Sequence, residues 1–360
     1  MSALGRVAVL LLTYLLLCPL NAAAFERGEV EKFAMLPKGF GNPEGITVDS
    51  HGNVYVTTFA VTAATGTPGQ LFVFSRQGHL QRRVPIIGSS NLLLGLDFLP
   101  HSEHLLVIDF GNKQVLKVNP WTGESWVFAT LPTAPVDLRS GAGLNALTFD
   151  NDRNVYISDS FQGIIWKTGP DGGTSVAWVT DPLLTTTGVP GFGANGLGFN
   201  KAFSTLFVAN TGNDTVVQIP VIGGNPGVPS VLTNSINGAD GLIIDKDDNL
   251  WVAANQADEI VVIDKTGKAI AKLGDFDGID KHGAPIGLLF PASLVRFGEW
   301  IYITNLSLDL RITGMPGPQT VDSQWAAQVN SYTISRIRAR IPRLSGLCDD
   351  HGHRRSERCD

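Results

Sequence analysis

The sequence predicts an all-β protein folded as a six-bladed β-propeller. Pairs of short β-rich runs recur along the chain at intervals of 45 to 53 residues, with little helical periodicity between them. Glycine accounts for 40 of the 360 residues and is frequent in the turn-like segments between these runs. A repeat of this length that is built from strands is typical of a propeller blade.

Each of the six units contains an alternating apolar strand, a polar turn and a second strand. The units begin with PEGITVDSHGNVYVTT, LLGLDFLPHSEHLLVID, LNALTFDNDRNVYISD, ANGLGFNKAFSTLFVAN, ADGLIIDKDDNLWVAAN and ASLVRFGEWIYITN. A third strand follows, as QLFVFS, QVLKVN, IIWKTG, TVVQIP, EIVVID and, in the last unit, SYTISRIR. Because the chain runs back and forth within a blade, the six first strands are expected to line one central channel.

The last unit has no regular fourth strand after Arg338. At the other end of the chain, VEKFAMLP (Val30–Pro37) resembles VFATLP (Val127–Pro132), which we assign to the fourth strand of blade two. We therefore expect the N-terminal strand to complete the last blade, which would leave no free sheet edge. The propeller is expected to span residues 25–340 as one domain.

Residues 1–24 have the pattern of a secretory signal peptide. Arg6 precedes an apolar run, Val7–Leu17, and the small residues Ala22, Ala23 and Ala24 precede Phe25. The run is too short for a membrane span, so we expect cleavage and a secreted or periplasmic protein with no membrane association after cleavage.

The rest of the composition excludes some partners. The chain has a formal net charge of −6, which argues against nucleic acid. Residues 341–360 are expected to form a polar, flexible tail that contains Cys348 and Cys359. These cysteines could pair in an oxidising compartment, or stay unpaired. A monomer is expected.

One position at the start of each first strand is mostly polar. The six equivalent residues are Glu44, Leu94, Asn145, Asn195, Asp240 and Ser293. Equivalent repeat positions superimpose around a propeller axis, so these side chains are predicted to form a ring at one end of the channel, called the top here. An alternative is that each polar residue only caps its own turn.

Two carboxylates and two amides that converge in a channel would be unfavourable without a cation. Oxygen ligands without His or Cys select a hard ion and favour Ca²⁺, with Mg²⁺ or Mn²⁺ left open. The predicted metal ligands are Glu44, Asn145, Asn195 and Asp240.

The motifs NPEGITVD, GLNALTFD, GANGLGFN and NGADGLIID resemble the senescence-marker-protein/gluconolactonase/luciferin-regenerating-enzyme family, part of a superfamily of six-bladed calcium-dependent lactonases and phosphotriesterases. The resemblance covers Val30 to about Arg338. It implies that the Glu, two Asn and Asp of these motifs bind a catalytic divalent ion. One departure is Gly143, since the gluconolactonase branch is expected to have an Arg there for sugar-lactone recognition. Arg139, in the same loop, is the nearest arginine before Asn145 and could reach the channel by another path.

Two residues, Asp240 and His282, are candidates to assist an attacking water by proton transfer, and Asp240 could instead act as a nucleophile. By strand order, His282 in the loop DGIDKHGAPIG is the one histidine outside the tail that is expected at the top. It is either a general base or a solvated loop residue. A second polar series ends the second strands and is expected to form turns, with only Asp109 and Asp159 near the ion: Thr58, Asp109, Asp159, Asn210, Asn255 and Asn305.

Three long top loops are predicted to form an apolar rim around the ion, or simply to pack onto the blades. They are Phe59–Gly69, Asp181–Gly193 and Leu306–Gln328, with Leu183, Leu184, Phe192, Met315 and Trp325 as the apolar members. This arrangement predicts a metal-dependent hydrolase of a small lactone or related ester, in which the ion polarises the carbonyl and water attacks.

The alternative is a non-catalytic binding propeller with a structural metal, because GITVDSHGNVYVT and GLIIDKDDNLWVA resemble NHL repeats. The change from Glu to Leu, Asn and Asp at one repeat position favours an asymmetric site over a uniform repeat.

Overall fold

The computed structural model describes residues 26–64, 66–133, 137–313, 320 and 322–342. The chain divides into two compact units, Arg27–Ile341 and a second unit that combines Met1–Glu26 with Pro342–Asp360. Only residues 26 and 342 of the second unit are described, so the fold below is that of Arg27–Ile341. The predicted signal peptide and the two tail cysteines lie outside the described residues.

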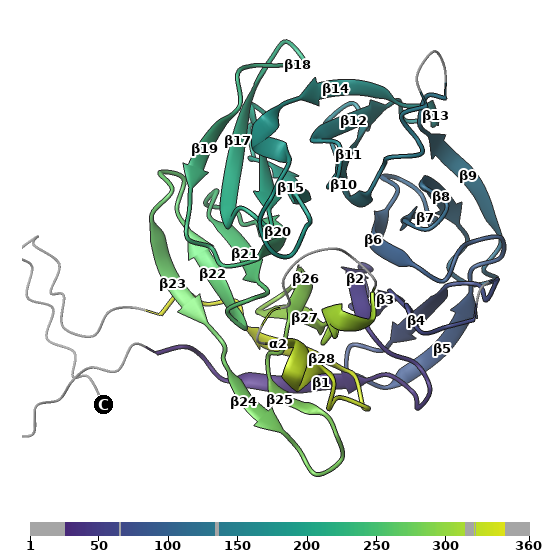
Figure 1. Ribbon diagram of the computed structural model, residues 1–360, viewed down its shortest axis with the longest axis vertical. Helices are drawn as coiled ribbons and strands as arrows, with labels where there is room; N and C mark the ends of the chain where they lie inside the picture. The colour runs from purple at the N-terminus through teal and green to yellow at the C-terminus, as the bar shows by residue number, and fades with distance from the viewer. Residues whose placement is uncertain (1–25, 65, 134–136, 314–319, 321, 343–360) are drawn as a thin grey trace, which may run out of the picture. The chain divides into compact units, whose positions relative to one another are not determined.

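Arg27–Ile341 forms six blades around a central channel, as predicted (Figure 1). Blade one contains β2 (Pro43–Val48), β3 (Val54–Thr58), β4 (Gln70–Phe74) and β5 (Leu80–Pro85). Blade two contains β6 (Leu93–Phe98), β7 (Leu105–Asp109), β8 (Gln114–Val118) and β9 (Ser125–Thr130), to which β13 (Gly173–Thr174) adds in parallel. Blade three contains β10 (Leu144–Phe149), β11 (Val155–Asp159), β12 (Ile164–Thr168) and β14 (Val176–Thr180).

Blades four to six continue the same order around the ring. Blade four contains β15 (Ala194–Phe199), β16 (Thr205–Asn210), β17 (Thr215–Ile222), β18 (Asn225–Pro226) and β19 (Ser230–Thr233). Blade five contains β20 (Ala239–Ile244), β21 (Leu250–Ala254), β22 (Glu259–Ile263) and β23 (Ala269–Leu273). Blade six contains β26 (Pro291–Phe297), β27 (Trp300–Asn305), β28 (Thr333–Arg338) and β1 (Val30–Met35).

A few elements lie outside the blades. They are a hairpin of β24 (Phe276–Ile279) and β25 (Pro285–Gly287), the 3₁₀ turns η1 (Pro182–Leu184) and η2 (Leu310–Ile312), and the short helix α2 (Asp322–Ala326). No helix in the described part of the chain has the length and hydrophobicity that a membrane span requires.

The N-terminal strand closes the ring, which confirms the prediction. β1 pairs antiparallel with β28, with Val30 opposite Ile337 and Met35 opposite Thr333. In Figure 1 the purple N-terminal strand lies along the yellow-green C-terminal one. The first and last parts of the fold therefore share one sheet. β1 is its outer strand and supplies the fourth strand that the sixth sequence unit lacks.

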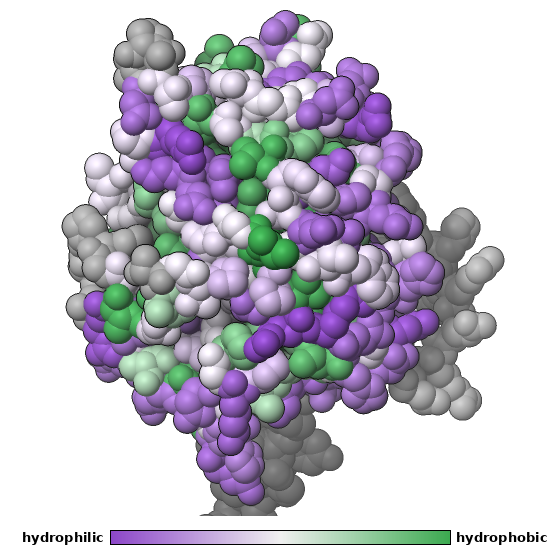
Figure 2. All heavy atoms as spheres, turned by 90° about the vertical axis from the view of Figure 1, so that its right-hand side faces the viewer, coloured by the Kyte–Doolittle hydropathy of each residue, from purple (hydrophilic) through white to green (hydrophobic). Residues whose placement is uncertain are grey.

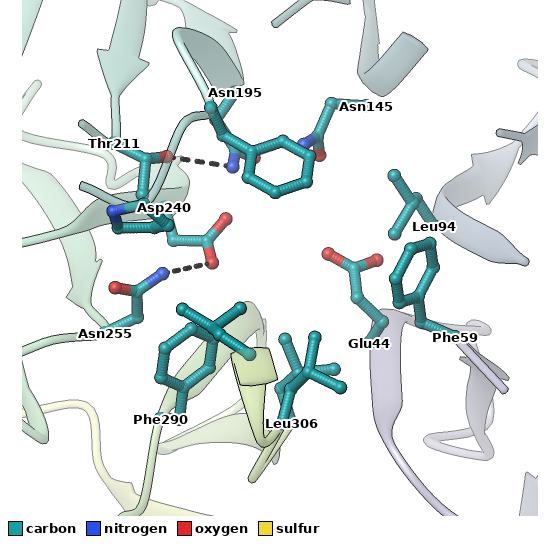
Figure 3. Close-up of a pocket in the computed structure, with 14 residues that line it drawn as sticks. Glu44, Phe59, Leu94, Asn145, Asn195, Thr211, Asp240, Asn255, Phe290 and Leu306 are labelled. Atoms are coloured by element: carbon teal, nitrogen blue, oxygen red, sulfur yellow. Dashed lines mark hydrogen bonds between the residues drawn. The ribbon is translucent and has the colours of Figure 1, made fainter. Parts of the chain in front are cut away.

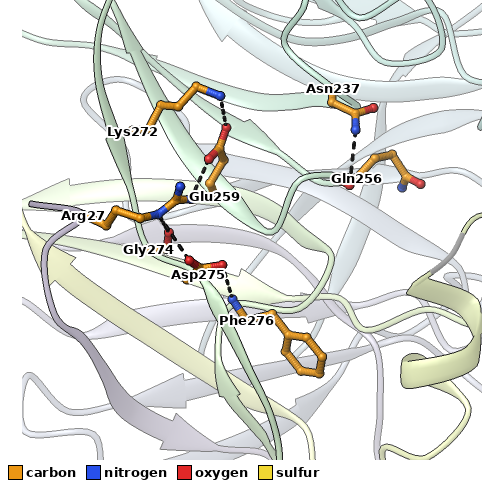
Figure 4. A network of polar contacts seen from close by, with 8 residues as sticks. All are labelled: Arg27, Asn237, Gln256, Glu259, Lys272, Gly274, Asp275 and Phe276. Carbon is orange, nitrogen blue, oxygen red and sulfur yellow. Dashed lines mark hydrogen bonds and ion pairs between the residues drawn. The ribbon is translucent and has the colours of Figure 1, made fainter. Parts of the chain in front are cut away.

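Arg27 fastens the chain before β1 to blade five (Figure 4). Its Nη2 donates to Glu259 Oε2 at 2.6 Å, and its Nε donates to Gly274 O at 2.8 Å. Lys272 Nζ donates to the other carboxylate oxygen of Glu259 at 2.7 Å. The Glu259 side chain is only 6% exposed, so its charge is stabilised by these two cations. The segment that completes blade six is thus also attached to its neighbour.

The outer faces of the blades mix polar and apolar residues. The face that carries the outer strands of blades one and two shows green groups interrupted by purple and white ones (Figure 2). Ile87 and Val127, which belong to these blades, are 60% and 54% exposed. Exposed apolar side chains of this kind are common on soluble proteins and by themselves indicate no binding surface.

Each first strand carries a β-bulge where it enters the channel. In blade one, Pro43 lies opposite Thr58 and Ile46 lies opposite Val56, so Glu44 and Gly45 together face one residue of β3. The same register shift occurs at the start of the first strand in the other five blades. A bulge re-aims one side chain, here toward the channel. It also brings strands close together, because a Cβ on Gly45 would lie 2.3 Å from Leu94 O of the next blade.

Candidate metal centre

The bulges define the ring of residues at the top of the channel. By strand register its members are Glu44, Leu94, Asn145, Asn195, Asp240 and Ala292. The sequence alignment placed Ser293 in this ring, which is wrong by one residue. Ser293 instead follows the ring position, as Gly45 does in blade one, because the bulge interrupts the alternation on which the alignment depended.

The structure brings the four predicted ligands together. Figure 3 shows Glu44, Asn145, Asn195 and Asp240 pointing from four blades into one space. The four residues are only 4–5% exposed. They line a cavity of about 40 Å³, which has room for an ion and very few waters.

Hydrogen bonds fix the direction of the two amides. The Ser160 hydroxyl donates to Ala194 O at 2.6 Å and therefore accepts from Asn145 Nδ2 at 3.3 Å. In blade four, Thr211 donates to Ala239 O at 2.8 Å and accepts from Asn195 Nδ2 at 3.0 Å. Since the single proton of each hydroxyl is used on a carbonyl, each amide must present its nitrogen there. The amide oxygens are thereby left for the channel.

Asn255 supports Asp240 in the same way and was missed as a site residue. Its Nδ2 donates to Asp240 Oδ2 at 2.8 Å, while its Oδ1 accepts from Gln256 Nε2 at 2.8 Å. The sequence alignment made Asn255 a turn former, but the register pairs Ala254 with Ala239, so Asn255 is equivalent to Ser160. The signal was available, because Asn145 to Ser160 and Asp240 to Asn255 both span 15 residues.

The two carboxyl groups are held in an environment that disfavours their charge. Burial, with a smaller contribution from the charge of Asp240, raises the pKa of Glu44 well above its ordinary value. Burial raises the pKa of Asp240 to about 7, although hydrogen bonds from Asn255 and Asn195 act in the opposite direction. Glu44 Oε2 is buried and has no hydrogen-bond partner among the described residues. A cation between the carboxylates would remove this unfavourable electrostatic energy.

The donor set fits a hard cation. Nowhere in the described residues do three His, Cys, Asp or Glu side chains gather as a metal site. Binding at the ring would therefore depend on two carboxylates plus the amide oxygens of Asn145 and Asn195. Oxygen ligands of this kind suit Ca²⁺.

Apolar residues form most of the cavity wall. They are Phe59, Leu94, Pro190, Phe192, Phe290, Leu306, Leu308 and Leu310. Of the rim residues expected from the sequence, only Phe192 lines this cavity. Leu184 is fully buried in the core, Trp325 packs against Phe276 with ring centroids 5.5 Å apart, and Met315 lies outside the described residues. The wall is thus built largely by strand ends and the segments next to them.

His282 does not reach the candidate site. It is exposed in the turn of the β24–β25 hairpin, where its backbone N donates to Asp280 Oδ1 at 2.7 Å. Figure 1 shows this hairpin at the outer edge of the ring, directed away from the channel. The prediction from strand order that His282 lies at the top of the channel is wrong, because the segment that leads into blade six forms a separate hairpin.

The remaining polar candidates also have local roles. Asp109 accepts from Ser90 Oγ and Asn112 Nδ2, and Asp159 accepts from Gly143 N and Trp166 Nε1. Both are turn formers, and neither lines the cavity. Arg139 is half-buried and donates to Asn112 O at 2.7 Å. It does not line the cavity, so the structure brings no arginine of this loop into it.

Comparison with known protein sequences gives one family match, which lies in blades four and five. The family model described as an SMP-30/Gluconolactonase/LRE-like region matches residues 190–274, which include Asn195, Asp240 and Asn255. No curated protein sequence gives a significant match.

Three solved structures illustrate the fold similarity. A luciferin-regenerating enzyme is 16% identical with a TM-score of 0.61, covering 86% of this chain and 95% of that one. A gluconolactonase from Xanthomonas campestris is 12% identical with a TM-score of 0.59, covering 88% and 93%. The calcium-binding protein regucalcin from Agrobacterium tumefaciens is 15% identical with a TM-score of 0.55, covering 88% and 99%.

Identities this low establish a shared fold and leave activity to be argued from the site. The sequence match is more specific, since it spans the two blades that supply Asn195 and Asp240. Residues 190–274 match the SMP-30/gluconolactonase/LRE-like family model, and the family resemblance inferred from the motifs GANGLGFN and NGADGLIID is confirmed for this part of the chain.

Proposed function

We propose that the protein is a Ca²⁺-dependent hydrolase of a lactone or related ester. The observation that carries this proposal is the buried ring of oxygen ligands, in which Glu44 Oε2 has no partner among the described residues. A ring that only capped local turns would have no need for an unpartnered buried carboxylate oxygen.

Glu44, Asn145, Asn195 and Asp240 would hold the ion. When bound, Ca²⁺ would supply Lewis-acid polarisation of a substrate carbonyl. Asn255 keeps Asp240 in place through its 2.8 Å hydrogen bond. The Asp240 carboxylate would also lie beside the ion, where it could accept a proton from an attacking water. A direct nucleophilic role for Asp240 is the alternative within the same mechanism.

The relatives support this choice of chemistry. One structural neighbour is named a calcium-binding protein and another a gluconolactonase. The wall of this cavity is mainly apolar, and Gly143 stands where the gluconolactonase branch is expected to have an arginine. These features favour a lactone or ester that is less hydroxylated than a sugar lactone.

We also propose that the protein acts after export and as a monomer, with residues 1–24 as the signal peptide. N-terminal sequencing of the exported protein should start at Phe25 if cleavage follows Ala24. An N-terminus at Met1 on exported protein would contradict this part of the proposal.

The activity test is hydrolysis of a panel of lactones, aryl esters and phosphotriesters by the purified protein, with chelator and with added Ca²⁺. Turnover that is lost with chelator and restored by Ca²⁺ supports the proposal. Asp240→Asn should abolish this turnover, whereas His282→Ala, which changes a residue far from the cavity, should leave it unchanged. Wild-type turnover in Asp240→Asn at saturating Ca²⁺ would refute the catalytic role.

A binding propeller with a structural ion is the second candidate. The cavity of about 40 Å³ favours it, because that volume is small compared with the usual range for ligand pockets. Calorimetry separates the two. Tight Ca²⁺ binding without turnover of any substrate in the panel would favour the binding propeller.

A further inference from the structure

Blade one contains a second cavity, separate from the channel. Its volume is about 310 Å³, and it lies beneath the loop that joins β3 to β4. The residues that matter for its chemistry are Phe40, Asn42, Thr58, Gln70 and Asn91. None of its described lining residues carries a charge.

Two buried polar atoms in this cavity wall have no hydrogen-bond partner among the described residues. They are Thr58 Oγ1 and Gln70 Oε1, on residues that are 1% and 9% exposed. The orientation of the Gln70 amide is fixed, since its Nε2 donates to Pro68 O at 2.7 Å and a carbonyl can only accept. The free atom is therefore an acceptor without a donor among the described residues, and a bound ligand could supply one.

In blade two, the two residues at the equivalent positions are hydrogen-bonded to each other. The register makes Asp109 and Gln114 the counterparts of Thr58 and Gln70. In blade two, Gln114 Nε2 donates to Asp109 Oδ2 at 3.2 Å, and only residues 110–113 separate the two strands. Blade one has the shorter side chain of Thr58 and the longer loop Phe59–Gly69. Blade one thus lacks the polar pair of blade two, and the two counterpart residues line a cavity.

We propose that this cavity binds a small neutral polyhydroxy compound of monosaccharide or polyol size. Hydroxyl groups can donate to Gln70 Oε1 and pair with Thr58 Oγ1, and the uncharged wall disfavours ionic ligands. The volume lies at the lower end of the range for ligand pockets, which is about 300–1,000 Å³. The proposal concerns a site apart from the channel and does not depend on hydrolase activity.

Binding is tested on the metal-free protein by calorimetry and saturation-transfer NMR, with D-glucose and xylitol as probes. Glucuronate and glucosamine serve as charged analogues. We expect glucose, xylitol or both to bind in the millimolar range and the charged analogues to bind more weakly. Failure of both neutral probes, with water as the sole occupant, would overturn the proposal.

Variants assign any binding to this cavity. Thr58→Val preserves shape but removes the hydroxyl, and Gln70→Leu removes the acceptor; each should weaken binding by about tenfold or more. Thr58→Asn should restore the pairing seen in blade two, so that binding is lost while the melting temperature is retained. Thr174→Val, at an exposed threonine in β13, is the matched control and should bind as the wild type does. Unchanged affinity in folded Thr58→Val and Gln70→Leu would refute the site.

Discussion

Replacing Asn255 by alanine should weaken Ca²⁺ binding without removing any ligand. Asn255 is 2% exposed and Asp240 is 5% exposed, so their hydrogen bond is shielded from water. The substitution leaves Asp240 in the ring but removes the donor that holds its Oδ2 at 2.8 Å. The ionised carboxylate, which is the form that binds a cation, then loses its stabilising partner.

The size of the effect follows from the kind of hydrogen bond. Hydrogen bonds to charged groups contribute about 1.5–3 kcal/mol, which corresponds to roughly 10- to 150-fold in affinity. In the wild type the Asn255 amide lowers the pKa of Asp240, so its removal should let this pKa rise further above about 7. The affinity loss should therefore be larger at pH 7 than at pH 9.

The assay is calorimetric titration of the purified protein with Ca²⁺ at both pH values. Gln256→Ala is the control, because Gln256 donates to Asn255 and not to Asp240. It should change the affinity by less than about threefold. A folded Asn255→Ala variant with wild-type Ca²⁺ affinity at both pH values would refute the role of Asn255 and the ring as the ion site.

Three further outcomes are expected. Because the pKa of Asp240 is raised to about 7 in the folded protein, Asp240 keeps its proton at pH values where the unfolded chain has lost it. The free energy of unfolding of the metal-free protein should therefore fall between pH 4 and pH 7. Ca²⁺ should raise the melting temperature more at pH 8 than at pH 5, and the reverse order would contradict this. Arg27→Ala should cost about 1 kcal/mol of stability in urea unfolding, since Glu259 keeps Lys272, whereas Lys246→Ala in an exposed pair should cost almost nothing. A chain that starts at Lys38 lacks β1 and should aggregate or lose cooperative melting, so a truncated chain that melts like the wild type would show that closure is dispensable.

Most of the fold was predictable because strand alternation and turn chemistry are local properties. The repeat length gave the six blades, and the likeness of VEKFAMLP to VFATLP gave the closing strand, now seen as β1 beside β28. The β24–β25 hairpin was not predictable in the same way. Its strands are short and form a separate two-stranded sheet, so no repeat position marked them, and His282 was misplaced with them.

The candidate site was predictable where a residue type recurred at one repeat position. Glu44, Asn145, Asn195 and Asp240 were found this way. The error at Ser293 arose at the bulge, which shifts the pairing by one residue and which period-two alternation does not register. The error at Asn255 has another origin, because the alignment followed the polar residue type and took Asn255, in place of Ala254, as the end of the second strand. The glycine after the ring position in blades one, two, four and five marks the bulge, since a Cβ there would meet the next strand.

The functional asymmetry of the propeller comes from two positions in each blade. One is the ring position. The other is the residue that directly follows the last paired residue of the second strand, such as Ser160 after Asp159. Blades three, four and five are polar at both, as Asn145 with Ser160, Asn195 with Thr211 and Asp240 with Asn255. Blades one, two and six have Phe59, Phe110 and Leu306 at the second position, so that half of the channel is apolar.

Glu44 is the one predicted ligand that enters from the apolar half. Its counterpart of Asn255 is Phe59, which cannot donate a hydrogen bond, and this explains why Glu44 Oε2 lacks a partner while the other ligands are held. In the proposed site, Asn145, Asn195 and Asp240 would hold the ion from one side and Glu44 from the other, and Leu94, Phe290 and Leu306 also line the cavity. A substrate group that approached the ion would therefore do so along an apolar surface, with the fixed polar groups behind the ion.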